Sequence, residues 1–331
     1  MQSELIEVVV VTRNSAGHIG ACVDSIIAAQ ALPIIVDNGS TDDTLEIVRS
    51  RCPETKIIAT GENLGYGRAL NVGFKETREN FVILSNPDVV FLDGSIRQMV
   101  EFLEKNPRVG VTGPQQTFPD KTWQRSYGDL PGIWPGIKDA VGITTLQNSL
   151  RRILWPRKID RKPKQVPYVD GAVLAVRREA FSQMSGFDED FFFYSEESDL
   201  CWRMKKAGWK VIFLPCAEVI HVRGASSAKM GRSDQLLRYM VSNQRLLAAK
   251  HLPPWKARLY AKFQICHFVR LGLICGVLQR FGREKSSRSY KIWMFDAYTR
   301  IWKELSECRQ LIHAPTPDAK ANECKETVKA N

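Results

Sequence analysis

The stretch Pro33-Ile-Ile-Val-Asp-Asn-Gly-Ser-Thr-Asp-Asp-Thr-Leu-Glu-Ile-Val-Arg-Ser-Arg51 decides the fold. It holds a short apolar run, a polar loop and an amphipathic segment in that order, which predicts a buried strand followed by a helix. The same unit precedes it, with a strand over Ile6–Thr12 and a helix over Ile19–Gln30. Continuously apolar strands that alternate with helices are typical of a parallel sheet covered on both faces.

The rhythm continues toward the C-terminus and then stops. It predicts further strands and helices at Lys56–Ala59, Tyr66–Glu76, Phe81–Ser85, Ser95–Glu104 and Val109–Thr112. Prolines, glycines and tryptophans punctuate residues 118–164, and a basic cluster closes that segment. We interpret residues 118–164 as a long mobile loop.

Strand character returns after this loop, so that the sheet becomes mixed. The pattern predicts a strand at Val166–Val176, a helix at Glu196–Ala207 and strands at Lys210–Leu214 and Glu218–Val222. The fold class is therefore α/β, with a Rossmann-like mixed sheet flanked by helices over residues 1–232. Residues 233–312 are predicted to form a helical, membrane-associating region, and residues 313–331 a disordered tail.

Composition excludes disordered and fibrous classes. The chain has 331 residues, of which 44% are hydrophobic, enough to bury one large core. Its eight cysteines are scattered without paired spacing, which favours free thiols over a zinc site. No charged and apolar leader opens the sequence, so we expect the protein to stay in the cytosol.

Charge is divided unevenly along the chain. Residues 1–200 contain 22 Lys and Arg against 27 Asp and Glu, whereas residues 201–331 contain 25 against 9. This basic half implies an anionic partner, either nucleic acid or a membrane face, unless it is only a solvated basic surface. The apolar stretch at 263–281 is interrupted by His267, Arg270 and Gln279, which predicts an interfacial helix or a core-packing helix pair.

Candidate ligand-binding residues follow the predicted strands, because open parallel sheets bind ligands beyond the carboxyl ends of their strands. Asp37 ends the second strand, where its carboxylate could accept hydrogen bonds from a ribose hydroxyl or a pyrimidine N–H. Ser40 and Asp43 are predicted to form a capping box for the next helix. Asn86-Pro-Asp88 follows the fourth strand and offers the oxygen ligands that a divalent cation prefers.

Two other segments carry candidate residues. Glycines at 65, 67 and 73 do not match the dinucleotide-binding spacing, but this loop could approach a nucleotide and Arg68 could contact a phosphate, or the loop is a plain turn. His221 follows a predicted strand and could complete a metal shell, although a lone histidine is commonly buried for structural reasons.

The predicted helix at 196 begins with Glu196, Glu197 and Asp199. A helix dipole alone can explain carboxylates in a first turn, and Asp199 is predicted to pair with Arg203 along the surface. The preceding run Phe191-Phe-Phe-Tyr194 would place the carboxylates beside apolar walls. Such walls raise a carboxylate pKa toward the range of a general base.

Taken together, these motifs resemble those of the family 2 glycosyltransferases, particularly the bacterial rhamnosyltransferase-like members. The resemblance covers about residues 5–225 and is carried by Thr12-Arg-Asn14, Val36-Asp-Asn-Gly-Ser-Thr-Asp42, Asn63-Leu-Gly65, Asn86-Pro-Asp88, Asp170-Gly-Ala172 and Tyr194-x-Glu-Glu-x-Asp-Leu-x-x-Arg203. It implies a GT-A fold, an inverting reaction and a divalent metal, Mg²⁺ or Mn²⁺. It also implies a nucleotide-diphosphate sugar donor, with dTDP-rhamnose as the best candidate, and a glycan acceptor on a polyprenyl diphosphate at the inner face of the plasma membrane.

The resemblance also implies residue roles. Glu197 matches the catalytic base, with Glu196 beside it. Donor contacts fall on Thr12, Asn14, Asp37, Asn63, Gly65, Arg68, Asn86 and Asp88, acceptor contacts on Asp170, Gly171, Asp199 and Arg203, and metal contacts on Asp88 and His221. Asn86 stands where many members have aspartate, which removes one anionic ligand. The alternatives are a non-catalytic nucleic-acid-binding protein, for which no groove-reading helix is found, and a nucleotidyltransferase on a similar sheet.

Overall fold

The computed structural model describes residues 5–154, 162–222, 234–281 and 285–307. Within these residues the main sheet has nine strands in the order β3-β2-β1-β4-β10-β6-β11-β5, with β8 paired to β11, and β7 and β9 form a separate two-stranded ribbon. The strands are β1 (Ile6–Thr12), β2 (Ala31–Asp37), β3 (Lys56–Ala59), β4 (Phe81–Ser85), β5 (Val89–Phe91), β6 (Val109–Thr117), β7 (Tyr127–Gly128), β8 (Lys164–Gln165), β9 (Tyr168–Val169), β10 (Val173–Arg177) and β11 (Lys210–His221).

The parallel half of the sheet aligns the strand ends that the sequence singled out. β1 pairs in parallel with both β2 and β4, and Thr12 lies opposite Asp37. β10 is antiparallel to β4 and to β6, which makes the sheet mixed. The carboxyl ends of β1, β2 and β4 therefore meet at one edge.

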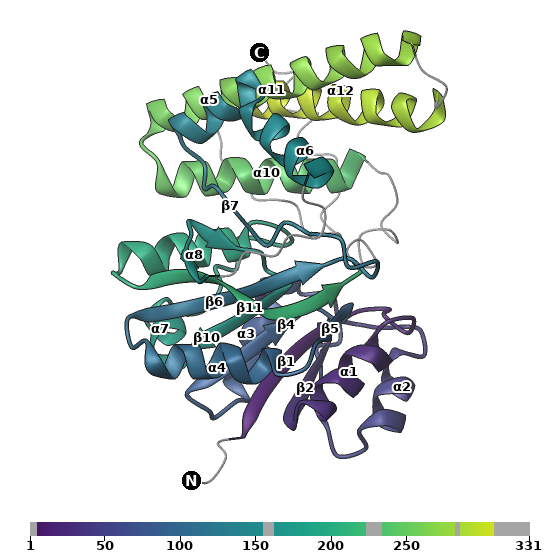
Figure 1. Cartoon of the computed structure of the whole chain (residues 1–331), viewed down its shortest axis with the longest axis vertical. Helices are drawn as coiled ribbons and strands as arrows, with labels where there is room; N and C mark the ends of the chain where they lie inside the picture. Colours follow the sequence, from purple (N-terminus) through teal and green to yellow (C-terminus); the bar gives the residue numbers. More distant parts are fainter. Residues whose placement is uncertain (1–4, 155–161, 223–233, 282–284, 308–331) are drawn as a thin grey trace.

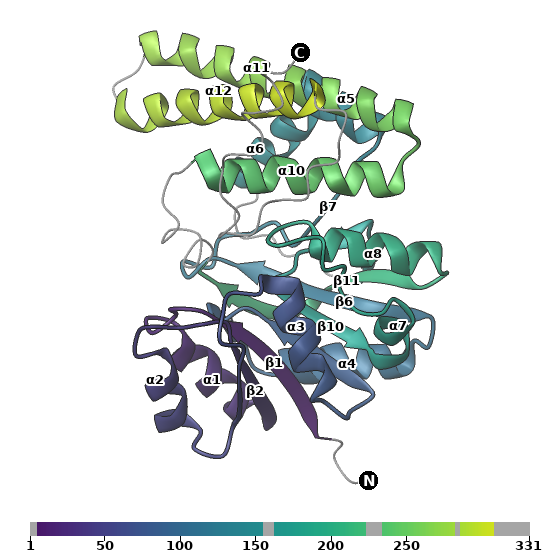
Figure 2. The same ribbon diagram turned by 180° about the vertical axis from the view of Figure 1, so that it is seen from behind.

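Helices cover both faces of the sheet, because the side chains of its strands alternate between two cores. Val8 and Val10 of β1 belong to one core and Val9 and Val11 to the other. The first face is covered by α1 (Ile19–Ala28), α2 (Thr44–Arg51) and α4 (Ser95–Lys105), and the second by α3 (Tyr66–Lys75), α7 (Arg178–Gln183) and α8 (Glu196–Lys206). Figures 1 and 2 show these two sides.

Five further helices form a layer above the sheet domain (Figure 1). They are α5 (Ile133–Val141), α6 (Ile143–Leu154), α10 (Asp234–His251), α11 (Pro254–Phe281) and α12 (Lys285–Glu307). Trp302 and Ile301 of α12 are fully buried against Tyr260 of α11. Phe191 packs with Leu246 and Leu247 of α10, which ties this layer to the segment before α8.

Several sequence predictions are corrected here. Residues 118–164 are not one long loop, because they contain α5 and α6. The strand predicted at Val166–Val176 is broken into β9 and β10 by a turn, and the two strands predicted from Lys210 are one strand, β11, with an irregularity between Leu214 and Glu218. The short elements β5 and α7 were not predicted.

The predicted capping box is also wrong. Helix α2 begins at Thr44 rather than Asp42, and Asp43 makes no capping bond. Instead Ser40 Oγ accepts a hydrogen bond from the Asn14 backbone, and Asp42 accepts from the Thr44 backbone N–H. The polar residues of this loop therefore hold the first two strand ends together rather than close a helix.

Three predictions concern the cysteines, the apolar stretch at 263–281 and the C-terminal tail. All six cysteines within the described ranges are free. Among the same residues, no helix combines the length and apolar character needed to cross a bilayer. The tail predicted at 313–331 lies outside the residues that the structure describes.

Candidate functional site

The donor-side residues predicted at the first two strand ends form a connected polar rim. The Asp37 carboxylate accepts a hydrogen bond from the Ser40 backbone N–H at 3.2 Å. Asn14 Oδ1 accepts one from the Thr41 backbone at 2.7 Å. Thr12 Oγ1 is buried and has no hydrogen-bond partner within the described residues, which is uncommon for a hydroxyl. This edge therefore presents a fixed carboxylate beside an unsatisfied hydroxyl.

The loop before α3 joins the same rim. Asn63 Oδ1 accepts a hydrogen bond from Asn38 Nδ2 at 2.9 Å. Gly65 has a φ of 85°, and a Cβ there would collide with the Phe192 carbonyl oxygen. Glycine is thus required at this position by the backbone of the segment that leads to α8. Arg68 donates to the Glu189 carbonyl at 3.2 Å and pairs with the Glu189 carboxylate, and its contact with a phosphate stays a prediction.

Asp88 and His221, predicted as metal contacts, lie side by side although 133 positions separate them in the sequence. His221 Nε2 is 3.5 Å from Asp88 Oδ1, and both side chains are almost fully buried. The pairing of β5 with the end of β11 brings them together. Asp88 Oδ1 accepts no hydrogen bond from any described residue.

Two glutamines orient the His221 ring. Its Nδ1 lies 2.9 Å from Gln116 Oε1 and 2.9 Å from Gln124 Oε1. Because both contacts are to amide oxygens, Nδ1 is the donor in both. An imidazole whose one proton is on Nδ1 would present the Nε2 lone pair to the Asp88 carboxylate. Two electron-pair donors that face each other across 3.5 Å fit a cation held between them.

Asp88 and His221 could supply two ligands to a metal ion. Within the described residues, no three His, Cys, Asp or Glu side chains converge as metal ligands. Asn86 follows β4, and its backbone N–H donates to the Ala172 carbonyl at 2.9 Å. A cation on Asp88 and His221 would therefore need further oxygen ligands from a bound molecule.

Glu196 and Glu197 begin α8 in an acidic environment, with Glu196 buried and Glu197 half-buried. Burial, and next the negative charge of Asp170, raises the pKa of Glu197 to about 7. Burial, and next the charge of Glu197, raises the pKa of Glu196 well above its usual value. The rise in pKa has the predicted direction, with burial as its first cause and a neighbouring carboxylate as its second, whereas walls formed by Phe191–Tyr194 stay a prediction. A carboxylate with a pKa near 7 is suited to accept a proton at neutral pH.

Tyr66 joins the acidic residues into one site. Its hydroxyl donates to the Gly171 carbonyl at 2.9 Å. Burial, followed by the charges of Glu196, Asp88, Asp170 and Glu197 in that order, raises the pKa of Tyr66 well above its usual value. The negative charges of four carboxylates from three separated segments of the chain thus act on one half-buried tyrosine hydroxyl.

The turn Asp170-Gly171 lies directly against the candidate base. A Cβ on Gly171 would lie 3.2 Å from Glu197 Cβ, so that this glycine leaves room for the glutamate. Asp170 Oδ1 accepts a hydrogen bond from Gln116 Nε2 at 3.2 Å, which links the turn to the glutamine that orients His221. The predicted acceptor segment is therefore linked through Gln116 to the predicted metal pair, and the predicted base packs against the same segment.

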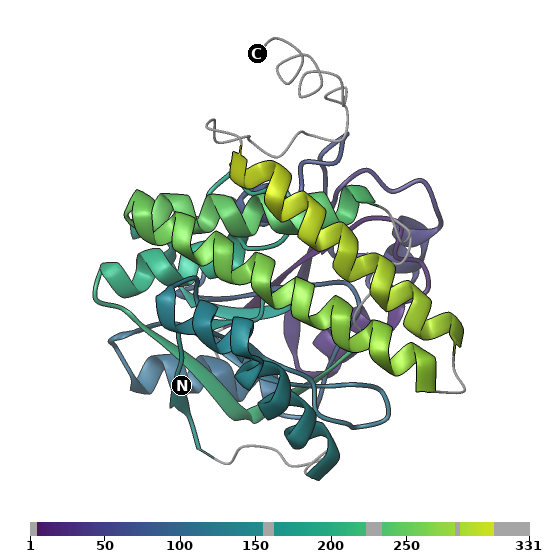
Figure 3. The ribbon, with the colours of Figure 1, turned by 90° about the horizontal axis from the view of Figure 1, so that it is seen from above.

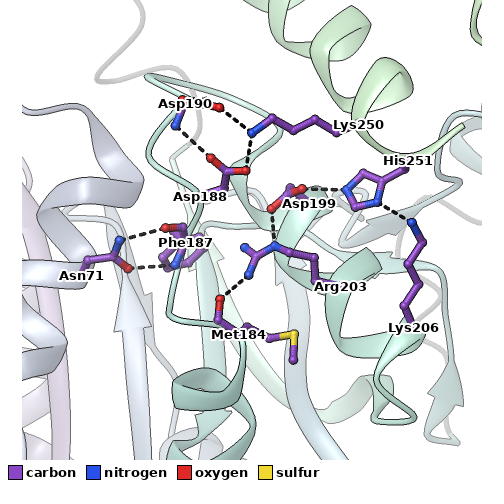
Figure 4. Close-up of polar contacts among 10 residues, drawn as sticks. All are labelled: Asn71, Met184, Phe187, Asp188, Asp190, Asp199, Arg203, Lys206, Lys250 and His251. Carbon is purple, nitrogen blue, oxygen red and sulfur yellow. Dashed lines mark hydrogen bonds and ion pairs between the residues drawn. The ribbon is translucent and has the colours of Figure 1, made fainter. Parts of the chain in front are cut away.

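Asp199 and Arg203 form the predicted pair, but not on the surface. Asp199 is 1% exposed, and its carboxylate accepts from Arg203 Nε at 2.6 Å. Its other oxygen lies 2.7 Å from Nε2 of His251, at the end of α10 (Figure 4). Lys250, which precedes His251 on α10, pairs with Asp190 at 2.6 Å. These contacts fasten α8 to the helical layer, and an acceptor-binding role for Asp199 and Arg203 stays a prediction.

Asp199→Ala is expected to lower the free energy of unfolding by about 3 kcal/mol, because Arg203 and His251 would each lose a buried anionic partner. Urea unfolding of the full chain, followed by circular dichroism, measures this loss. Asp93→Ala is the matched control, since Asp93 is exposed. A loss as small as that of the control would contradict the structural role of Asp199.

Sequence reasoning missed Tyr66, Gln116, Gln124 and His251. Gln116 lies beyond Thr112, where the sequence predicts that the strand ends, whereas β6 continues to Thr117. The polar residues that directly continue this apolar strand are buried, and their position was the signal available for finding Gln116. Tyr66 and His251 carry no local pattern, because their partners come from distant segments.

Comparisons with known proteins complete this description. Residues 7–185 match the model described as "Glycosyl transferase family 2", and residues 160–298 match "Glycosyl transferase family group 2". A relative from Mycobacterium tuberculosis, named N-acetylglucosaminyl-diphospho-decaprenol L-rhamnosyltransferase, is 33% identical over 78% of this chain and 88% of its own. The dTDP-rhamnosyl transferase of Shigella flexneri is 23% identical over 70% of this chain and 73% of its own.

The solved structures agree on the architecture. A mannosyltransferase from Pyrobaculum calidifontis, in complex with GDP-Man and Mn²⁺, superposes with a TM-score of 0.56 at 18% identity, covering 90% of this chain and 85% of its own. GalNAc-T7, solved with UDP, GalNAc and Mn²⁺, superposes with a TM-score of 0.58 at 15% identity, covering 93% of this chain and 58% of its own. The predicted GT-A-type sheet flanked by helices is thereby confirmed.

Proposed function

Because the chain belongs to glycosyl transferase family 2, we propose that it transfers a sugar from a nucleotide-diphosphate donor to an acceptor hydroxyl with inversion, using Glu197 as the base. One observation carries this proposal: a half-buried carboxylate whose pKa is raised to about 7 lies against the Asp170-Gly171 turn, which Gln116 links to a paired aspartate and histidine. Family membership favours glycosyl transfer over nucleic-acid binding and nucleotidyl transfer.

The reaction is a direct displacement at the anomeric carbon of the donor sugar. Glu197 accepts the proton of the acceptor hydroxyl as that oxygen attacks, while the nucleoside diphosphate departs from the opposite side. The rim of Thr12, Asn14 and Asp37 holds the nucleoside, and the Asp170-Gly171 turn positions the acceptor beside the base. Desolvation of Glu197, and next the negative charge of Asp170, keeps the pKa of the base near neutral pH.

Asp88 and His221 would hold a divalent cation, Mg²⁺ or Mn²⁺, with the remaining ligands supplied by the donor. The facing lone pairs and the unpartnered Asp88 oxygen support this assignment. Such a cation would neutralise the negative charge that develops on the departing diphosphate. Asn86 would offer a neutral amide where a second carboxylate would bind more tightly, so that Asp88 and His221 would be the main protein ligands of the cation.

We further propose that the donor is dTDP-rhamnose and that the acceptor is a glycan carried on a polyprenyl diphosphate, in cell-surface polysaccharide synthesis. The names of the relatives in M. tuberculosis and S. flexneri, both rhamnosyltransferases, support these choices. Residues 1–232 are assigned to catalysis. Residues 233–312 are assigned to peripheral attachment at the inner face of the plasma membrane.

A donor screen tests the proposed function. We expect dTDP release from dTDP-rhamnose only when a lipid-linked glycan acceptor is present, and no comparable release from UDP-, GDP- or other dTDP-sugars. Release of nucleoside diphosphate is the measurement, with heat-denatured protein as control. Release from a different donor would overturn the choice of rhamnose, and no release from any nucleotide sugar would overturn the proposed chemistry.

A further inference from the structure

Helix α6 exposes an unusually apolar face to solvent. Ile143, Leu146, Leu150, Ile153 and Leu154 are all exposed, from 43% for Leu150 to 74% for Ile153. Their spacing of three, four, three and one residues places them along one side of the helix. Trp134, at the start of α5, is also 74% exposed. Large aliphatic side chains gathered on one helix face, rather than scattered singly, mark an interaction surface.

Helix α11 carries a second exposed stripe. Val269, Leu273, Ile274 and Val277 are exposed in its C-terminal half. Arg258 and Lys262 are exposed in its N-terminal half and continue the same side of the helix. Trp255 is exposed where the helix begins.

The two stripes belong to one packed unit. Arg270 of α11 donates to the Asp139 carbonyl of α5 at 3.2 Å and to Thr145 Oγ1 of α6 at 3.3 Å. Gly136 of α5 has room only for hydrogen against Phe263 of α11, which brings these two helices into close contact. Viewed from above, α6, α11 and α12 all lie in view over the sheet domain (Figure 3).

The positive charge of α6 and α11 favours an anionic partner. Residues 143–154 and 254–281 contain no aspartate or glutamate at all, whereas they contain Arg151, Arg152, Lys256, Arg258, Lys262, Arg270 and Arg280. Basic side chains beside exposed aliphatic and tryptophan side chains are the composition of helices that lie in an anionic membrane interface. A second copy of the same face would bring like charges together, which disfavours self-association.

The chain connects this unit directly to the acceptor side of the site. Helices α5 and α6 are inserted between β7 and β9, which pair with each other. The Asp170 backbone N–H, just after β9, donates to the Ser126 carbonyl, just before β7, at 2.9 Å. The insertion therefore leaves and returns beside Asp170 and the candidate base.

We propose that the exposed faces of α6 and α11 dock the enzyme on the surface of an anionic bilayer, with Leu146 and Ile153 of α6 inserted below the headgroups. The purpose of this docking rests on the proposed function: it presents a membrane-carried acceptor to the Asp170 side of the site. It assigns the contact to α6 as well as to the C-terminal helices. The binding itself requires no catalysis.

Vesicle co-sedimentation of the full chain tests the proposal without donor or acceptor. The probes are vesicles of phosphatidylcholine alone and of phosphatidylcholine with phosphatidylglycerol. We expect binding to the anionic vesicles, which weakens in high salt, and about a tenfold or greater loss of binding for the double variant Leu146→Glu, Ile153→Glu. The matched control is Leu5→Glu, Ile27→Glu, which makes the same change at two exposed apolar residues outside the helical layer.

The outcomes separate this inference from the catalytic one. Equal sedimentation of the α6 double variant and the wild type, or no binding of the wild type to anionic vesicles, would overturn docking through α6. A wild-type dimer that the α6 variant dissociates, with no vesicle binding, would show instead that this face joins two copies. Unchanged thermal unfolding of the variants excludes misfolding, and Glu197 variants should sediment like the wild type even if the proposed chemistry fails.

Discussion

Glu197→Gln is expected to lower turnover by about 10²–10⁴-fold while donor affinity stays close to that of the wild type. The amide preserves the size of the side chain, and its oxygen can still accept the hydrogen bond that Ser198 Oγ donates to Glu197 Oε1 at 2.9 Å. It cannot accept the proton of the acceptor hydroxyl. Steady-state transfer rates and donor titration by calorimetry measure the two quantities separately.

The pH dependence of kcat/KM tests the assignment of Glu197 as the base independently. The base must be deprotonated, and burial raises the pKa of Glu197 to about 7. We therefore expect kcat/KM to rise with pH through about 7 and to fall about tenfold per pH unit well below it. Glu197→Gln should abolish this rise.

Two matched variants decide between the neighbouring glutamates. Glu196→Gln should retain most of the activity, and Glu179→Gln should behave as the wild type because Glu179 is exposed on α7. Near-normal turnover in Glu197→Gln, or a greater loss in Glu196→Gln, would exclude Glu197 as the base.

Asp88→Asn is expected to lower kcat/KM by about 10²-fold and to make the remaining activity insensitive to EDTA. Asparagine keeps the shape of the side chain but removes the negative charge that faces His221 Nε2 at 3.5 Å. The turn itself should persist, because it is the Asp88 backbone carbonyl that accepts from the Val222 N–H. Donor titration with and without Mn²⁺ measures the coupling between donor and metal.

The control and the contradicting result are equally specific. Asp93→Asn changes an exposed carboxylate five residues away and should leave both kcat/KM and the EDTA response unchanged. Wild-type sensitivity to EDTA in Asp88→Asn would place the cation elsewhere. Activity of the wild type that survives complete removal of divalent metal would remove the metal from the proposal.

The parallel half of the fold was predictable because its signals are local. β1, β3 and β4 have the bounds that the sequence predicts, because apolar residues fill the centre of each strand. Residues that follow such strands, Asp37 and Asp88 among them, therefore fell at the correct edge. The helical start at Glu196 was predicted for the same reason, from three carboxylates after an aromatic run.

Other parts of the structure had no local signal. α5 and α6 were taken for a loop because their prolines and glycines suggest turns, and because the apolar face of α6 is exposed rather than matched to a core. The antiparallel insertion of β10 between β4 and β6 depends on pairing across the chain, which periodicity does not report. The contact of His251 with Asp199 likewise spans 52 positions and joins two separate layers.

The fastening of α8 to α10 constrains how relatives of this chain diverge. Tyr194 and Ser195, just before the candidate base, adopt φ values of 73° and 76°, which are costly for residues with a side chain. Asn243 of α10 donates to the backbone carbonyls of Phe193 and Tyr194 at 2.8 and 3.1 Å and so steadies this bend. A chimaera that takes its C-terminal helices from one parent must therefore inherit residues 187–199 from that parent too, because the two segments were fitted to each other.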